Sequence, residues 1–356
     1  MTFTYTSSFR PIANQPVRFG CRMLVFNSPK PKSGEAQEEQ AQLIYNLTSA
    51  GGNSLLKQST RGPLRNDLEG DQWEKAQPNE GYTDPTGIFR SDGFGLAYHQ
   101  HGSHEEKAIR SNKPAWSESG YAIWANALSK LHQTLSKKMN GLNLMVHVRN
   151  MAKSAPTSSD QDMHPYILGD WMLMRHGMAS PTDREALNKL HDAAMEKYGD
   201  FGLKSDSDTA KIARCLAARL VEQTGSPDIR NLKTEQVRQI LQGLLQKIAS
   251  AEDPSKPTST YNIALSDTTQ RGREIVVSYS GPVPSLGVQP RPMQMAIHTR
   301  KDGAQDLICA LEKMQPDPKQ GLLTWHTIPN NTIATFKLDK NNQWKYNPVP
   351  LLPEKK

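Results

Sequence analysis

An arginine and a histidine stand together where an apolar run of the sequence ends. The run over residues 171–174 is followed by Arg175, His176 and Gly177. An apolar run that stops at a glycine is typical of a short buried strand that leads into a turn. Open α/β sheets bind their ligands at the carboxyl ends of such strands. A histidine beside an arginine at that position could hold a phosphoryl group and attack it.

The composition favours an anionic partner. The 356-residue chain carries 43 lysine and arginine residues against 36 aspartate and glutamate residues, a net charge of +7. A chain of this length is typical of two domains, each long enough to bury a core. The positive balance suits phosphate esters, although it also serves solubility. Because the basic residues are spread along the chain and form no single block, this pattern argues against a nucleic-acid partner.

The cysteines and the apolar runs indicate a cellular compartment. Cys21, Cys215 and Cys309 are far apart and odd in number. This pattern suggests neither a disulfide framework nor a metal site, and a reducing compartment fits it best. Residues 1–10 lack the apolar core of a signal peptide, and no stretch approaches about 18 consecutive apolar residues. We therefore expect a soluble cytoplasmic protein without a membrane partner, with export by an unconventional route left open.

Apolar periodicity divides the chain into a sparse first part and a denser second part. Residues 28–90 are rich in Pro, Gly, Gln, Asn and Ser, and only residues 39–56 there have a helical pattern. Later helices are expected over residues 121–138, 183–198, 209–224, 237–248 and 303–314. Strands are expected over residues 21–26, 142–148, 261–265, 274–279, 293–298 and 332–338, in addition to the one that ends at His176.

A histidine-rich loop near residue 100 offers a different chemistry. His104 followed by Glu106 is similar to the His-x-Glu of zinc-dependent nucleobase deaminases, in which a zinc ligand and a proton shuttle share a helix turn. Those enzymes need two downstream thiolates, and this chain has Thr157 and Asp160 at the matching places. Threonine is a poor zinc ligand, so a degenerate deaminase-like domain around His104 is a second alternative only.

Several motifs, taken in order, resemble the histidine phosphatase superfamily of phosphoglycerate mutases, acid phosphatases and phosphohistidine phosphatases. Residues 173–179 look like that family's strand-terminal Arg-His-Gly. Residues 203–220 are similar to its Leu-Thr-x-x-Gly-x-x-Gln-Ala helix, with Ser207 and Thr209 replacing the usual glycine and glutamine. Residues 226–234 resemble its Ser-Pro-x-x-Arg-Ala-x-x-Thr motif.

The resemblance continues into the last third of the chain. Residues 295–298 look like the strand that carries the family's second histidine, and residues 330–338 with Trp344 resemble its last strand. The resemblance implies an α/β fold of three layers, with a mostly parallel sheet flanked by helices, over residues 166–346. A less regular region of unknown role over residues 1–165 would precede this domain, and a polar tail over residues 347–356 would follow it.

The family's chemistry assigns roles to five residues. His176 would attack the phosphorus of a phosphomonoester or a phosphohistidine and form a phosphohistidine intermediate. Arg175 and Arg230 would each offer a planar fork to phosphate oxygens, and His298 would donate to them as charge builds. Asp267 is the candidate proton donor, in competition with two loop carboxylates. The resemblance implies a phosphoric monoester hydrolase that acts on a phosphorylated small molecule or a phosphoprotein, without a metal or a cofactor.

One position leaves an alternative open. Residues 276–282 resemble the same strand as residues 295–298, with Tyr279 where the second histidine belongs. If Tyr279 rather than His298 faces His176, the domain becomes a degenerate phosphate- or protein-binding module of the same fold. A packed core histidine at position 176 is the structural alternative.

Overall fold

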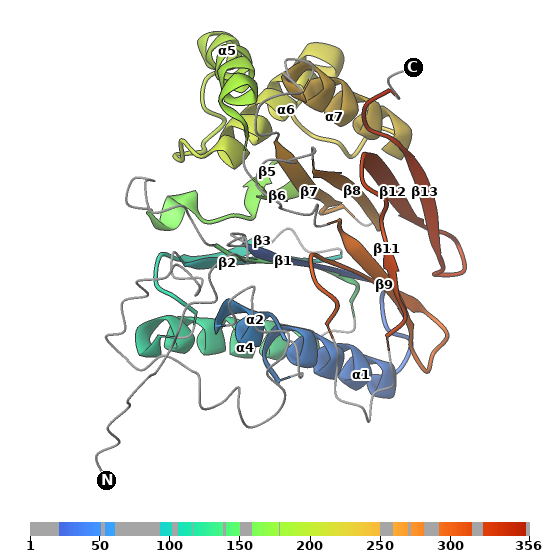
Figure 1. Ribbon diagram of the computed structural model, residues 1–356. Helices are drawn as coiled ribbons and strands as arrows, with labels where there is room; N and C mark the ends of the chain where they lie inside the picture. Colours follow the sequence, from blue (N-terminus) through green and yellow to red (C-terminus); the bar gives the residue numbers. More distant parts are fainter. Residues whose placement is uncertain are drawn as a thin grey trace, which may run out of the picture.

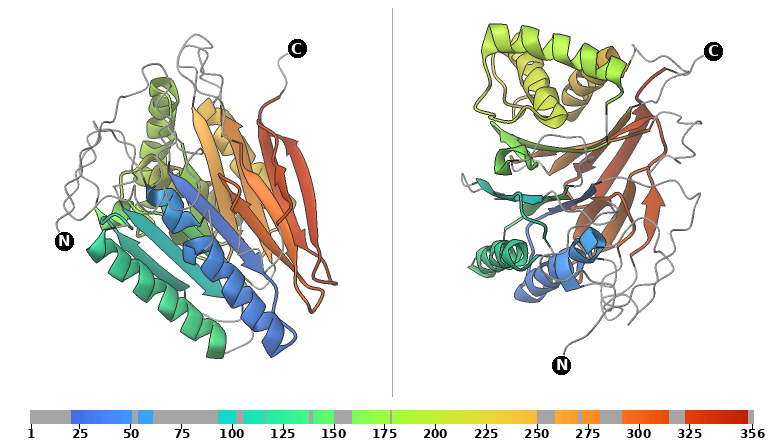
Figure 2. Two further views of the ribbon diagram at one scale, coloured as in Figure 1. Left: turned by 60° about the horizontal axis from the view of Figure 1, so that its bottom comes forward. Right: turned by 60° about the vertical axis from the view of Figure 1, so that its left-hand side comes forward.

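The chain folds into two stacked β-sheets with helices on both outer sides. The computed structural model describes residues 21–50, 54–60, 93–101, 106–115, 117–137, 140–149, 159–177, 179–249, 259–269, 272–280, 292–314 and 323–353. One helical layer covers the first sheet and another covers the second, which gives four layers (Figure 1). The same layering is visible from two other directions in Figure 2.

Sheet A has seven strands, and every neighbouring pair in it is antiparallel. Its order is β11-β9-β10-β1-β4-β2-β3, so that β1 is the central strand. The strands are β1 (Arg22–Ser28), β2 (Phe94–Gln100), β3 (Glu106–Ser111), β4 (Leu142–Val148), β9 (Gln294–Thr299), β10 (Gln305–Ala310) and β11 (Trp325–Thr327).

Sheet B has six strands and is also antiparallel throughout. Its order is β13-β12-β8-β7-β6-β5. The strands are β5 (Tyr166–Leu168), β6 (Trp171–His176), β7 (Thr260–Asp267), β8 (Arg273–Ser280), β12 (Thr332–Leu338) and β13 (Trp344–Pro350).

The helices are segregated by sequence. The outer side of sheet A is covered by α1 (Gly34–Tyr45), the π-helical turn η1 (Asn46–Ala50), α2 (Leu55–Thr60) and α4 (Glu118–Lys137). The outer side of sheet B is covered by α5 (Pro181–Tyr198), α6 (Asp208–Thr224) and α7 (Thr234–Ala249). A 3-10 turn, η2 (Asp160–Asp162), precedes β5. Ser207 caps α6 by accepting from the Ala210 amide at 3.2 Å, and Gly225 ends the helix with a left-handed φ of 78°.

Strand alternation separates the core into three layers of side chains. On β1, Leu24 and Phe26 point outward into the cluster with α1 and α4, whereas Met23 and Val25 point toward sheet B. The side chains between the sheets form the inter-sheet layer. Its apolar members include Met23, Val25, Ala97, Met145, Met172, Met174, Ala264, Val276, Leu307, Cys309 and Phe336.

The expected fold class is wrong. The sheets are antiparallel and number two, whereas a histidine phosphatase fold has one mostly parallel sheet between helices. Parallel strands need a crossover between them, usually a helix. Here α5, α6 and α7 follow one another without an intervening strand, and from β7 to β13 the described residues include no helix. That segregated order is typical of antiparallel sheets.

Individual elements were predicted with mixed success. The helix over residues 121–138 and the strands over residues 142–148 and 332–338 are confirmed by α4, β4 and β12. The helix over residues 303–314 is wrong, because strand β10 occupies that stretch. Strands β9, β10 and β11 from the last third of the chain join sheet A, so that sheet A contains strands from both sides of residue 165. Among the described residues, no helix has the length and apolar character needed to cross a membrane.

Candidate active site

The two ends of the inter-sheet layer carry different polar side chains. At one end Asn27 Nδ2 of β1 donates to Glu274 Oε1 of β8 at 2.9 Å. Ser266 of β7 pairs with Glu274 on one side and with Met172 of β6 on the other. The carboxyl end of β1 therefore lies across from the amino end of β6, and we call this the acid end of the layer.

The opposite end carries the candidate site. Packed sheets keep their strands within about 30° of one another, and inner-face positions recur every second residue. Four residues back from Asn27 is Met23, and four residues on from Met172 is His176. From this count we infer that Met23 and His176 lie at about the same level and that Cys21, two residues before Met23, lies further out. We call this the thiol end.

Cys21 is the accessible thiol of this chain. All three cysteines are free, and Cys21 is partly exposed while the other two are buried. Burial raises the pKa of Cys215 to about 12 and holds the pKa of Cys309 well above its ordinary value. Because the thiolate is the nucleophile, neither buried cysteine can react near neutral pH. Of the three, only Cys21 is placed to do thiol chemistry.

Two arginines lie beside Cys21. Arg22 pairs with Val148 in the β1–β4 ladder, so the next step of the register places Cys21 opposite Arg149. The Arg149 amide donates to the Gly93 carbonyl at 2.9 Å, and its Nη1 donates to the Asp162 carbonyl at 3.1 Å. Arg22 is buried and pairs with Glu312 at 2.6 Å. Cationic groups near a thiol favour its ionised form.

Sheet B contributes a polar row at the thiol end. His176 of β6 pairs in register with Asn262 of β7, and Asn262 pairs with Ser278 of β8. All three alternate with members of the inter-sheet layer, so they share its inner face. Ser278 Oγ accepts from the Met293 amide at 3.0 Å. A histidine and an amide thus line the same end of the layer as the thiol.

Gly177 directs the chain away immediately after His176. Its φ is +132°, and a Cβ at this position would clash with the Thr260 carbonyl. Only glycine satisfies both conditions. The glycine that the sequence pattern marked as the end of a strand therefore has that role.

Two stacked histidines lie beside Met23 in the inter-sheet layer. His147 of β4 pairs with Met23 on one side and with Gly95 on the other, and its ring lies 3.7 Å from that of His164. Burial lowers the pKa of His147 well below its usual value, and the Arg149 guanidinium lowers it further. The pKa of His164 is also well below its usual value, mainly because the ring is buried and secondly because His147 and neighbouring arginines disfavour its charged form. Both rings are therefore neutral near pH 7.

Arg175 does not share a face with His176. It is buried on the helical side of sheet B, where Nη1 lies 3.7 Å from Asp208 of α6 and Nη2 donates to the Thr260 carbonyl at 3.2 Å. Its guanidinium stacks over the Tyr261 ring at 4.9 Å. Tyr279 stacks on Tyr261 from the same side, at 6.1 Å between ring centres.

Arg230 and Asp267 lie toward the other end of β6. Arg230 Nε contacts Asp170 at 3.2 Å in the turn before β6, and Asp267 pairs with Trp171 in register. Asp267 also forms a buried ion pair with Arg273. Arg230 and Asp267 lie near the amino end of β6, whereas His176 lies at its carboxyl end. The two ends are separated by the length of this six-residue strand, at about 3.3 Å per residue.

His298 belongs to the other sheet. It lies on the helical side of sheet A, with Nδ1 at 3.2 Å from Asp306 and Nε2 at 3.5 Å from Glu39 of α1. Neither His298 nor Tyr279 faces His176, since each lies on an outer face. Of the five residues assigned by sequence, His176 alone points into the thiol end.

The zinc alternative finds no support in the described residues. His104 and Thr157 lie outside them, and Glu106 begins strand β3 where the deaminase reading needs a helix turn. Asp160 begins η2 and accepts from the Asn112 amide at 2.6 Å. Within the described ranges, no three His, Cys, Asp or Glu side chains are grouped so that they could hold a metal ion.

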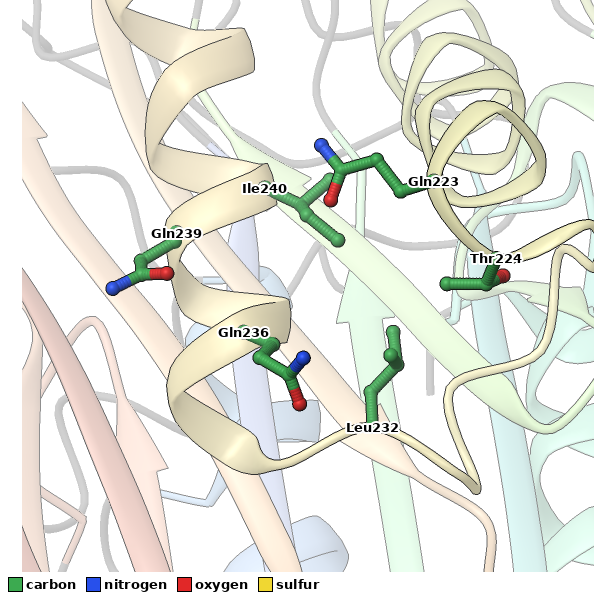
Figure 3. A pocket seen from close by; sticks show the side chains of 6 residues that line it. All are labelled: Gln223, Thr224, Leu232, Gln236, Gln239 and Ile240. Carbon is green, nitrogen blue, oxygen red and sulfur yellow. The ribbon is translucent and has the colours of Figure 1, made fainter.

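Two surface hollows lie away from the thiol end. One, of about 300 Å³, lies between the end of α6 and the start of α7, and Figure 3 shows its polar lining of Gln223, Thr224, Gln236 and Gln239. The other, of about 800 Å³, runs along α1 and α4 and includes His298. Both are open to solvent, and neither includes Cys21, His176 or Asn262.

Sequence reasoning missed Cys21 as a site residue. It was weighed only as one of three scattered cysteines, although it directly precedes the apolar run of β1. A cysteine immediately before a buried strand is the available signal. Arg149 and Asn262 carry no such signal, because register alone brings them to Cys21 and His176.

These layers define a class of architecture: an α-β-β-α sandwich of two antiparallel sheets. No family model matches the chain, and no curated protein matches it. Among solved structures, the chain is similar to a glutamine aminotransferase class-II domain protein from Silicibacter pomeroyi. That match is 14% identical and covers 73% of this chain and 92% of the other, with a TM-score of 0.44. At that level of similarity nothing about activity carries over.

The histidine phosphatase resemblance is therefore wrong, and so is the function drawn from it. The antiparallel sandwich is not that family's fold, and Arg175 and His176 lie on opposite faces of their sheet. Hydrolysis of a phosphomonoester or phosphohistidine through His176, and a phosphate-binding module of the same fold, both depended on that architecture. The short motifs that suggested the family occur here on unrelated elements.

Proposed function

We propose that this protein is a thiol-dependent hydrolase that cleaves an amide or ester bond with Cys21 as its nucleophile. We base the proposal on one observation: Cys21 is the partly exposed thiol of the chain and directly precedes the central strand of sheet A. We infer that His176 and Asn262, which share the inner face of sheet B, lie at the same end of the inter-sheet layer. Nucleophilic catalysis by cysteine needs a thiolate, a proton acceptor and an oxyanion donor in one place.

The proposed reaction has two steps. His176 takes the proton of Cys21, and the thiolate sulfur forms a bond to the carbonyl carbon while the carbonyl electron pair moves to oxygen. Asn262 donates from its side-chain amide to that oxyanion. The intermediate then collapses, the bond to the leaving amine or alcohol breaks, and the leaving group receives the proton from His176. Water hydrolyses the resulting thioester and restores the thiol.

The substrate in this proposal carries an anionic group. Arg149 lies opposite Cys21 on sheet A and can offer a planar pair of donors to a carboxylate or a phosphate. The net charge of +7 would also raise the local concentration of anions. An anionic small molecule or an acidic side chain of a protein is thus the expected partner, in a reducing cytoplasm that keeps the thiol free.

The test compares the full-length protein with its Cys21→Ala variant. Both are assayed for amine or alcohol release from a panel of primary amides and aryl esters, each with and without a carboxylate. We expect activity on carboxylate-bearing members in the native protein and its loss in the variant. Cys215→Ala, which changes a buried thiol on α6, is the matched control. Equal turnover by Cys21→Ala and the native protein would refute the assignment.

A further inference from the structure

The acid end of the inter-sheet layer holds a buried carboxyl group that the proposed chemistry does not use. Glu274 lies on β8 and Asn27 on β1, two strands of different sheets (Figure 1). Neither side chain is exposed to solvent. Asn27 Nδ2 and Ser266 Oγ both donate to Glu274 Oε1, at 2.9 and 2.5 Å. One oxygen of the carboxyl group is therefore fully satisfied.

The two remaining oxygens of this pair have no partner. Glu274 Oε2 and Asn27 Oδ1 are both buried and make no hydrogen bond in the described structure. These two oxygens belong to the same carboxyl and carboxamide groups that the hydrogen bond from Asn27 Nδ2 to Glu274 Oε1 joins. If Glu274 is ionised, Oε2 and Oδ1 are both acceptors and neither supplies a donor to the other, and a buried acceptor without a donor destabilises the fold. A single proton on Oε2 supplies the missing donor.

The surrounding groups do not compensate a negative charge on Glu274. Asp267 on β7 adds a second carboxylate, and Arg273, the neighbouring cation, pairs with Asp267. Cys309 of β10 is also close, and its thiol is held neutral by burial. On β12 the register partner of Glu274 is the apolar Phe336. Burial raises the pKa of Glu274 to about 8, against smaller lowering effects of Ser266 and Asn27.

We propose that Glu274 and Asn27 form a proton-dependent clamp between the two sheets. In the neutral state, the carboxyl and carboxamide groups exchange two hydrogen bonds and join β8 to β1. When Glu274 ionises, the second hydrogen bond is lost, two acceptor oxygens are left together, and a charge is buried without a partner. The acid end of the layer then loosens while the outer helices keep their contacts.

The direction of the pH effect follows from the raised pKa. The folded protein binds a proton at Glu274 that the unfolded chain releases near pH 4.5, so stability declines as pH rises from there to about 8. Glu274→Gln keeps a neutral group with both a donor and an acceptor, and it cannot ionise. It should therefore retain the two hydrogen bonds at every pH.

The experiment measures the melting temperature of the full-length protein from pH 5 to pH 9. Over this pH range, we expect the melting temperature of the native protein to fall by several degrees more than that of Glu274→Gln. Glu196→Gln, which changes an exposed glutamate of α5, should follow the native curve and serves as the matched control. Parallel curves for the native protein and Glu274→Gln would overturn the clamp.

A second measurement does not depend on the stability of a variant. Infrared difference spectra of the native protein between pH 7 and pH 9 should show the carbonyl band of a buried protonated carboxylic acid, which disappears as pH rises. Glu274→Gln should lack this band and Glu196→Gln should retain it. Absence of the band from the native protein at pH 7 would equally overturn the proposal.

Discussion

Arg175 and His176 are adjacent in the chain, yet their side chains lie on opposite faces of sheet B. Arg175 reaches Asp208 and the Tyr261 ring under the helices, while His176 alternates with Met174 and Met172 toward sheet A. Strand geometry dictates this outcome, because successive side chains of a strand point to opposite sides. The pair therefore has two separate roles.

Substitutions at the two positions should separate stability from activity. Arg175→Met loses a buried ion pair and a cation–π contact, so we expect unfolding free energy to fall by about 2–4 kcal/mol. The unfolding free energy of His176→Asn should stay within about 1 kcal/mol of the native value, while its turnover should fall by roughly 10²–10⁴-fold. Urea unfolding and substrate hydrolysis measure the two effects. If His176→Asn turned over substrate at the native rate, its catalytic role would be excluded.

The three cysteines should differ in their reaction with iodoacetamide. In the folded protein Cys21 should be alkylated first, because the other thiols are buried and their pKa values are raised. Peptide mass spectrometry after timed labelling distinguishes the sites. Labelling in urea is the control, in which all three cysteines should react alike; preferential labelling of Cys215 in the folded state would contradict the structure.

Arg149 should affect substrate binding more than the chemical step. Its register position opposite Cys21 places a guanidinium where an anionic substrate group would lie. For a carboxylate-bearing substrate, Arg149→Met should raise KM by roughly 10–100-fold, equivalent to about 1.4–2.7 kcal/mol of lost binding. Hydrolysis of a neutral analogue should change little. Equal losses on both substrates would exclude anion recognition by Arg149.

Gly95 should tolerate no side chain. A Cβ at Gly95 would clash with the carbonyl oxygen of His164, because the backbone at His164 packs directly against β2. Gly95→Ala should therefore cost roughly 2–3 kcal/mol of stability through displacement of the His164 segment. Gly243→Ala on α7 is the matched control, since nothing lies within 4 Å of the added methyl group. That variant should gain about 0.5–1 kcal/mol from helix propensity, and a comparable gain at Gly95 would contradict the packing.

Local pattern predicts the amphipathic elements of this fold well and the fully buried ones less well. Helix α7 has Val237, Leu241, Leu244 and Ile248 on one face, and its periodicity is unambiguous. Strand β10 is buried on both faces, with Leu307 and Cys309 toward sheet B and Ile308 toward α1 and α4. A strand without a polar face shows no alternation, which is why residues 303–314 favoured a helix.

The residues of the site could not be predicted from local sequence pattern, for a different reason. His176 could be selected because a strand-ending glycine follows it. Cys21, Arg149 and Asn262 are brought to it by two sheet registers and by the stacking of one sheet on the other. None of these relations has a fixed spacing along the chain. The phosphatase motifs matched because short strings of Arg, His and Gly carry little information about topology.

The position of β1 has a consequence for how the protein is made. The partner of β1 on one edge is β10, which is more than two hundred residues downstream. At about 5–20 residues per second, that edge of β1 stays unpaired for tens of seconds during synthesis, with its backbone groups open to other chains. The pairing of β1 is thus completed only after β10 has been made. A chain interrupted before residue 305 would carry the thiol without the sheet that positions it.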